Sequence, residues 1–168
     1  VLPDGSIVNT NERGLYDLKK LFIGAEGTLG IITKLRVRFV PLPEHIHTIL
    51  GIFSSIDDAV AAVSAIVADG IMPETLEAID RPMIEAILRA KPDIGYPADA
   101  DALLLIDISG TLNDIARQSN RIRELLRSHR ATAIRVAESA ADRQKLWEGR
   151  KSALSCASRI KPTVFVED

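Results

Sequence analysis

An arginine near the end of the sequence is the residue best suited to bind an anion. Apolar residues between positions 139 and 159 recur three and four places apart, which predicts a helix. Arg150 falls on the side of that helix that also carries Leu146, Trp147, Ala153, Leu154 and Ala157. A guanidinium among apolar neighbours needs an anionic partner, because burying it unpaired is costly. Two partners fit: an Asp or Glu of a neighbouring strand, or the carboxylate of a ligand bound through two parallel hydrogen bonds.

A glycine-rich stretch near the start is the second candidate site. Residues 17–33 read DLKKLFIGAEGTLGIIT, with glycines at positions 24, 27 and 30. The first residues predict one helical turn, Gly24 its left-handed end, and Ile31 the start of a strand. Glycine has no Cβ, so backbone N–H groups in such a loop can approach a phosphate or another anion. A tight turn without a ligand is the alternative interpretation.

Composition excludes several classes of protein. The chain has 168 residues, 46% of them hydrophobic and only 4% aromatic, so its core is built mainly from Ile, Leu, Val and Ala. A net charge of -2 gives no overall attraction for nucleic acid or anionic lipid. One cysteine, Cys156, rules out an internal disulfide framework, and we expect it to be buried rather than nucleophilic. Without a signal peptide or a run of about 20 apolar residues, a soluble, cytoplasmic chain is expected.

The three histidines give no sign of a metal site or of acid–base chemistry. His45 and His47 lie in a predicted linker and strand start, and His129 lies at a predicted helix end. None has the spacing of a metal ligand relative to another ligand residue. We therefore predict surface positions for all three, and no metal site.

The rest of the sequence predicts an α+β fold in two parts. Residues 2–8 predict a β-hairpin, and residues 31–40 alternate between apolar and polar or basic side chains, as a strand does. Pro41 and Pro43 then mark a domain boundary, so we expect one domain to end at residue 43 and a second to occupy residues 44–168. In the second, strands are predicted at 48–53, 75–79, 103–108, 132–136 and 163–167, helices at 55–69, around Pro82, at 112–126 and at 139–159, and a loop at 91–100. This order favours a ferredoxin-like antiparallel sheet with helices packed on one face.

The residue order of several of these segments resembles the sequence motifs of a known family. Residues 17–33 resemble the closing signature of the FAD-binding domain in vanillyl-alcohol-oxidase-like flavoproteins, with Ala25 in place of the usual Ser. The likeness is greatest to the branch that contains the flavoprotein component of glycolate oxidase, D-lactate dehydrogenase and D-2-hydroxyglutarate dehydrogenase. Residues 146–151 (LWEGRK) resemble the Trp-x-x-Arg motif of that branch, and residues 76–80 (LEAID) its Leu-Glu-x-x-Asp segment. Residues 159–168 resemble the glycolate oxidase pattern in particular.

The resemblance implies a cofactor, a reaction and roles for particular residues. It implies FAD, to which a hydride passes from C2 of a 2-hydroxy acid to give the 2-oxo acid. Arg150 would bind the substrate carboxylate, and the loop residues would contact FAD: Glu26, Gly27, Gly30, Ile31 and Ile32. Residues 1–43 would be the end of the FAD-binding domain and residues 44–168 an incomplete cap, or substrate, domain.

The resemblance also implies what lies outside these residues. The family's catalytic and metal-binding histidines follow the point where this sequence ends, so we expect no catalytic residue here and an inactive fragment of a larger enzyme. Leu154 stands where relatives acting on diacids have Thr, and no Lys closely precedes Asp168, which favours a small monoacid. Flavin and iron–sulfur partner subunits are implied, with attachment to the inner membrane only through them. The alternative function is a non-catalytic subunit or interaction module on the same fold.

Overall fold

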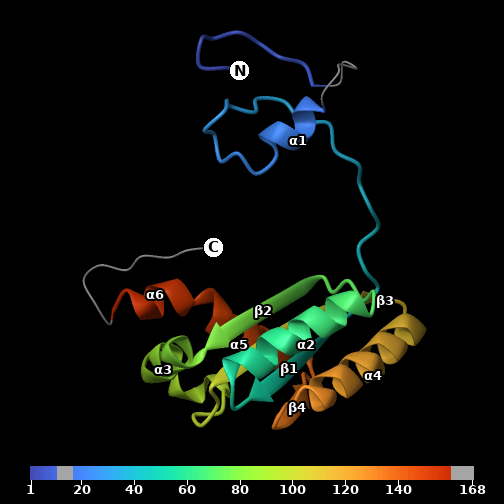
Figure 1. Ribbon diagram of the computed structural model, residues 1–168, viewed down its shortest axis with the longest axis vertical. Coiled ribbons are helices and arrows are strands. Elements are labelled where there is room, and N and C mark those ends of the chain that lie inside the picture. The colour runs from blue at the N-terminus through green and yellow to red at the C-terminus, as the bar shows by residue number, and fades with distance from the viewer. Residues whose placement is uncertain (11–16, 160–168) are drawn as a thin grey trace. The chain divides into compact units, whose positions relative to one another are not determined.

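The computed structural model describes residues 1–10 and 17–159, and the chain divides into two compact units, residues 1–41 and 42–168 (Figure 1). Each unit is described by itself below. Among the described residues, no helix is long and apolar enough to cross a membrane.

The described residues of the first unit, 1–10 and 17–41, form turns and one short helix, with little else that is regular. Gly5, at φ 83°, makes the turn that the sequence predicts, and its N–H donates to the carbonyl of Leu2 over 2.9 Å, although no strand is assigned at residues 2–8. Helix α1 (Leu18–Phe22) begins after Asp17, whose carboxylate accepts from the N–H of Lys19. Gly24, at φ 81°, ends this turn as predicted.

The predicted strand at residues 31–40 is wrong for this structure, which assigns no strand there. The side chains that would line its apolar face are exposed instead, with Phe39 at 91% and Leu35 at 75%. Alternation shows which face a strand would bury, but a strand also needs a neighbour to take its backbone hydrogen bonds. Ile31 alone has such a neighbour among the bonds formed here, since it exchanges two backbone hydrogen bonds with Val1.

The second unit is an α+β domain, as predicted, and its described residues form a sheet of four strands. Its elements follow in the order β1 (His45–Phe53), α2 (Ile56–Ala68), β2 (Thr75–Asp80), α3 (Arg81–Ala90), a 3₁₀ turn η1 (Pro92–Ile94), β3 (Ala102–Gly110), α4 (Leu112–Ser128), β4 (Ala133–Val136), α5 (Ala140–Lys151) and α6 (Ala153–Ala157). The sheet order is β2-β3-β1-β4 and every pairing is antiparallel, which is the ferredoxin-like arrangement. The predicted strand at 163–167 lies outside the described residues.

Helices cover both faces of the sheet (Figure 1), whereas the sequence predicts helices on one face only. On β3, Leu104 and Ile106 pack with residues of α2 and α4. Leu103 and Leu105 pack on the opposite face with residues of α3, α5 and α6. The reason is visible in the sequence: residues 102–106 of β3 form a continuous apolar run, and a strand segment of that kind is buried on both sides.

The predicted helix at residues 139–159 is interrupted at Ser152. Helix α5 ends at Lys151 and α6 begins at Ala153. The Ser152 hydroxyl donates to the carbonyl of Gly149 over 2.9 Å. A serine side chain that bonds to a backbone carbonyl one turn earlier competes with the helical ladder and bends it.

Side chains cap the N-terminal ends of α3, α4 and α5. Asp80, Thr111 and Ser139 each accept from the backbone N–H three residues later. Ser55 stands at the corresponding position before α2, but its side chain makes no capping hydrogen bond.

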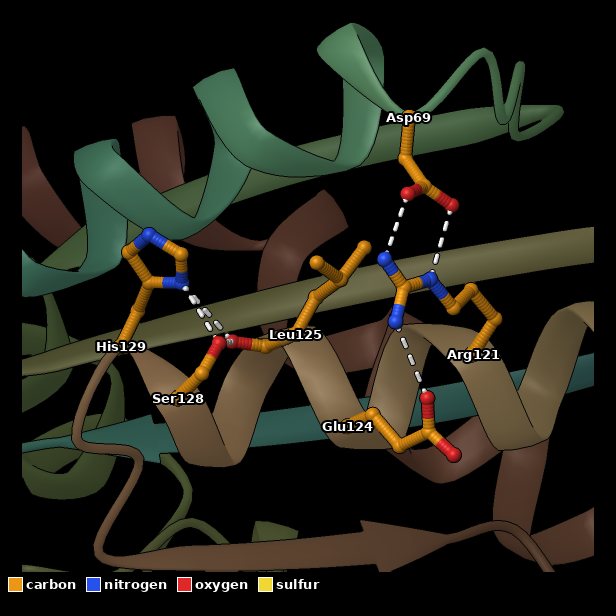
Figure 2. Close-up of polar contacts among 6 residues, drawn as sticks. All are labelled: Asp69, Arg121, Glu124, Leu125, Ser128 and His129. Carbon is orange, nitrogen blue, oxygen red and sulfur yellow. Dashed lines mark hydrogen bonds and ion pairs between the residues drawn. The ribbon is translucent and has the colours of Figure 1, made fainter.

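An arginine of α4 joins that helix to the end of α2 (Figure 2). Arg121 donates from Nε and Nη2 to the two carboxylate oxygens of Asp69, over 3.0 and 2.7 Å, and from Nη1 to Glu124 over 3.1 Å. Its hydrogen bond to Asp69 lowers the pKa of that carboxyl and raises the pKa of the guanidinium. At the end of the same helix, His129 Nδ1 lies 2.9 Å from the Leu125 carbonyl oxygen.

Candidate functional site

Helix α5 presents a stripe of three long side chains to carboxylates of the sheet. Arg143, Trp147 and Arg150 lie at positions i, i+4 and i+7, which places them on one side of a helix. Each donates a hydrogen bond to an acidic side chain of a strand. The stripe is the candidate functional site of the second unit.

Arg150 pairs with Glu77 of β2. Its Nε donates to Glu77 Oε2 over 3.0 Å, and the two side chains are 42% and 35% exposed. The sequence left two possible partners for Arg150, an acidic residue of a strand or the carboxylate of a ligand. The structure contains the first of them. That hydrogen bond uses Nε alone, so the edge of the guanidinium formed by Nη1 and Nη2 is not engaged by Glu77. A partly exposed arginine with this edge available is suited to bind a second carboxylate end-on.

Asp107 of β3 organises the other end of the stripe. It is 3% exposed and accepts from Arg143 Nη2 over 2.5 Å, from Trp147 Nε1 over 3.1 Å and from the hydroxyl of Thr48 over 2.5 Å. Thr48 stands directly opposite Asp107 in the β1–β3 pairing. A buried carboxylate needs such donors, because ionised groups are costly to remove from water.

Sequence reasoning missed Asp107, although a signal was present. It follows the apolar run of residues 102–106, where a charged residue is unexpected unless it is paired. Register then brings the two carboxylates together: Glu77 stands opposite Leu105, and Leu105 and Asp107 share one face of β3. Both acidic residues therefore lie on the face that α5 covers.

A tyrosine ring lies directly against the backbone of α5. Tyr96 is buried, and its hydroxyl donates to the carbonyl of Leu146 over 2.6 Å. A Cβ added to Gly149 would lie 2.6 Å from Tyr96 Cζ and Oη, so only glycine fits at that position. Burial raises the pKa of Tyr96 to about 12. A hydrogen bond with the Arg150 backbone and the charge of Arg150 oppose this rise without cancelling it. The predicted loop at 91–100 is thus a packed segment that fixes α5.

The glycine-rich loop is the candidate site of the first unit. Glu26 and Gly27 both have positive φ, 48° and 80°, and the N–H of Thr28 donates to the carbonyl of Ala25 over 2.8 Å. A Cβ at Gly27 would meet no atom within 4 Å, whereas one at Gly30 would lie 2.8 Å from the carbonyl oxygen of Val1. The positive φ at Gly27 and the close backbone packing at Gly30 explain why both positions are glycine.

The remaining candidate residues make no further site. Cys156 is buried, as predicted. His45 is exposed and His129 is bound at the end of α4, but His47 is partly buried, which lowers its pKa. Within residues 1–10 and 17–159, no group of three or more His, Cys, Asp and Glu side chains is placed to hold a metal ion. The pattern expected at residues 160–168 lies outside the described part of the chain.

Comparison with known proteins decides the family. The model of the FAD linked oxidases, C-terminal domain, matches residues 42–168. The chain belongs to the FAD-linked oxidases. The sequence is 38% identical to the glycolate oxidase subunit GlcD of Bacillus subtilis (strain 168), over all of this chain and 37% of that protein. It is 37% identical to GlcD of Escherichia coli (strain K12), over 91% of this chain and 30% of that protein.

A further relative agrees with this family, and solved structures share the fold. The mitochondrial D-lactate dehydrogenase [cytochrome] of Arabidopsis thaliana is 30% identical over 96% of this chain and 29% of its own length. Two crystal forms of alkyldihydroxyacetonephosphate synthase share the fold, with TM-scores of 0.57 and 0.61 over 95% of this chain and 31% of theirs, at 20% and 18% identity. The chain thus spans about a third of the length of these proteins.

FAD is the cofactor that membership of this family implies. The residues of the glycine-rich loop fit such a group: Gly27 has open space above its Cα, and the neighbouring Ile31 and Ile32 are exposed. Exposed apolar side chains beside a glycine-rich backbone suit a cofactor with a flat, largely apolar ring system and a charged phosphate portion.

Proposed function

We propose that this chain is part of an FAD-dependent dehydrogenase that oxidises a small D-2-hydroxy acid, of the glycolate or D-lactate type, to the 2-oxo acid. The names of the relatives, which include glycolate oxidase and D-lactate dehydrogenase, supply the substrate class. The observation that carries the proposal is the Nη1/Nη2 edge of Arg150, which Glu77 leaves unengaged on a side chain that is exposed enough to meet a ligand.

In this proposal Arg150 binds and orients the substrate. The two oxygens of the substrate carboxylate accept two parallel hydrogen bonds from Nη1 and Nη2, a geometry that fixes the plane of the carboxylate as well as its position. C2 carries both the hydroxyl and the transferred hydrogen, and it is bonded to the carboxylate carbon. Fixing the carboxylate therefore limits where C2 can lie, which is how positioning contributes to rate.

FAD, when bound, accepts the hydride that leaves C2. We propose that residues 1–43 are the last part of the FAD-binding domain and residues 44–168 part of the substrate domain. The loop would hold the cofactor through the backbone of Glu26, Gly27 and Gly30 and through contacts of Ile31 and Ile32. No described residue acts as the base for the hydroxyl proton in this scheme, so that group belongs to another part of the protein.

A small monoacid and partner subunits complete the proposal. Leu154, on α6, is largely exposed and has no group that could bind a second carboxylate. Two of the relatives are named as subunits of glycolate oxidase, so we propose that this protein works with flavin and iron–sulfur subunits. Any attachment to a membrane would then come through those partners.

The test uses the full-length protein that contains this chain. Purified protein is assayed against a panel of D-2-hydroxy acids, with an artificial electron acceptor. We expect a yellow flavoprotein that oxidises glycolate or D-lactate faster than D-2-hydroxyglutarate. A flavin-free preparation that is inert towards every acid would contradict the proposal and would favour a non-catalytic subunit.

The role of Arg150 has its own test. Arg150→Lys replaces a group that can donate two parallel hydrogen bonds with an ammonium that cannot. We therefore expect kcat/KM to fall by an amount equivalent to about 2–4 kcal/mol. Arg117→Lys is a control on α4, where Arg117 is 78% exposed and pairs with its helix neighbour Asp114. An unchanged kcat/KM for Arg150→Lys would leave Arg150 with the salt bridge to Glu77 as its only role.

A further inference from the structure

We propose that Glu77 is a positioning residue, which binds Nε of Arg150 and so directs the Nη1/Nη2 edge to the substrate carboxylate. This inference rests on the proposed function and deepens it. It also joins two interpretations of Arg150 that the sequence presents as alternatives, because a salt bridge to a strand and capture of a ligand use different edges of one guanidinium.

The argument begins with the shape of the guanidinium. A carboxylate can bind arginine side-on, through Nε and one Nη, or end-on, through Nη1 and Nη2. Glu77 Oε2 lies 3.0 Å from Nε, so the side-on edge of Arg150 is occupied within the protein. A ligand carboxylate is left with the end-on edge, and it meets a guanidinium whose rotation about its own stem is restricted by Glu77.

Glu77 itself is held by the sheet. It lies within β2 and stands opposite Leu105 of the central strand β3, so its Cα is fixed by the ladder on that side. A strand residue is a firmer anchor than a loop residue, because neighbouring strands determine its position. The negative charge of Glu77 also keeps the guanidinium paired when no substrate is bound, which lowers the cost of holding a cation at a partly covered site.

The pair is not needed to hold α5 in place. Asp107 anchors the same helix at Arg143 and Trp147, and Tyr96 packs against Gly149. Since Arg150 and Glu77 are 42% and 35% exposed, their ion pair adds little to stability. A role in orienting Arg150 is therefore separable from a role in folding.

The experiment uses the full-length flavoprotein with Glu77→Gln, Glu77→Ala, Arg150→Lys and the double variant Glu77→Ala/Arg150→Lys. Two quantities are measured: kcat/KM for D-lactate, and the Kd of its 2-oxo product pyruvate by isothermal titration calorimetry. We expect Glu77→Ala to lower kcat/KM about tenfold, mainly through KM, and to raise Kd to a similar extent. Glu77→Gln keeps an oxygen that accepts from Nε, so it should retain more of both.

The double variant distinguishes positioning from a general effect. Lysine has no guanidinium edge for Glu77 to direct, so Glu77→Ala should cost much less in the Arg150→Lys protein than in the wild type. Glu85→Gln is the matched control: Arg81 Nε donates to Glu85 Oε1 over the same 3.0 Å, with both side chains 47% exposed, on α3. That variant should leave kcat/KM and Kd unchanged, and all variants should keep the wild-type melting temperature within a few degrees.

Unchanged kcat/KM and Kd in Glu77→Ala, alongside a clear loss in Arg150→Lys, would overturn the inference and leave the proposed function standing. Equal losses from Glu77→Ala in the wild-type and Arg150→Lys backgrounds would overturn it as well. A wild-type protein that oxidises no acid but binds pyruvate more weakly once Glu77 is replaced would support the inference while the proposed function fails. A wild type that neither oxidises the acids nor binds pyruvate would overturn both.

Discussion

Gly149 and Tyr96 are in direct contact, with the ring of the tyrosine occupying the space where a side chain at position 149 would stand. Gly149 lies between Trp147 and Arg150 in the sequence of α5. The contact therefore sets how closely the helix that carries the candidate anion-binding residue approaches the segment after η1. Glycine is normally unfavourable inside a helix, so its presence here is explained by packing.

Replacing Gly149 with alanine should destabilise the protein. A Cβ 2.6 Å from Tyr96 Cζ requires either the ring or the helix to move, and such overpacking costs about 1–3 kcal/mol. Chemical denaturation measures the loss. Tyr96→Leu supplies the control background, in which Gly149→Ala should be neutral or stabilising, because alanine is the better helix former by about 1 kcal/mol. A Gly149→Ala protein as stable as the wild type would contradict the contact.

Stability should fall at high pH because of Tyr96. Its pKa is about 12 in the folded protein and near 10.0 when exposed, so between these values the unfolded chain releases a proton that the folded chain keeps. The free energy of unfolding is therefore unaffected below about pH 10 and decreases as the pH rises towards 12, by about 2–3 kcal/mol in total. Denaturation at a series of pH values, compared with Tyr96→Phe, measures this term. An identical pH dependence in Tyr96→Phe would disprove it.

Removing the Asp107 carboxylate should loosen the stripe of α5. Asp107→Ala leaves Arg143, Trp147 and Thr48 without their acceptor, at a cost of about 2–3 kcal/mol, since Arg143 can still reach solvent. Trp147 is the only tryptophan of the chain, so its fluorescence reports on this change directly. We expect a red-shifted emission. Asp107→Asn keeps one acceptor oxygen and should lose less; equal losses for both variants would mean that the hydrogen bonds do not carry the effect.

Two glycines of the loop test the proposed contact with FAD. Gly27→Ala places a Cβ-bearing residue at φ 80°, a strain of about 1–2 kcal/mol, and Gly30→Ala brings a Cβ within 2.8 Å of the Val1 carbonyl oxygen. In the full-length protein both should reduce the flavin bound per protein, measured by visible absorbance. Gly5→Ala is matched to Gly27→Ala, with φ 83° and open space, and should bind flavin normally. Normal flavin content in both loop variants would remove this loop from the cofactor site.

The sequence by itself determined the elements of the second unit and the family. Helical and strand periodicity located the strands and the major helices, because each element must turn an apolar face to the core. The continuous run in β3 already carried the information that both sheet faces are covered, although the prediction placed helices on one face only. The residue order at 17–33 and 146–151 was enough to indicate an FAD-linked oxidase. The match of the family model to residues 42–168 confirms this family.

Only the tertiary structure decided how Arg150 is partnered. Periodicity places a side chain on a face but does not say which residue of another element it meets, and Glu77 is 73 residues away in the sequence. The same holds for Asp107, whose donors come from β1 and α5, and for the contact between Tyr96 and Gly149. Residues 31–40 also depend on tertiary partners. Their alternation is typical of a strand, but no strand forms there because no neighbouring strand takes the backbone hydrogen bonds. Local preference selects an element, whereas its partners depend on the register and packing of the whole fold.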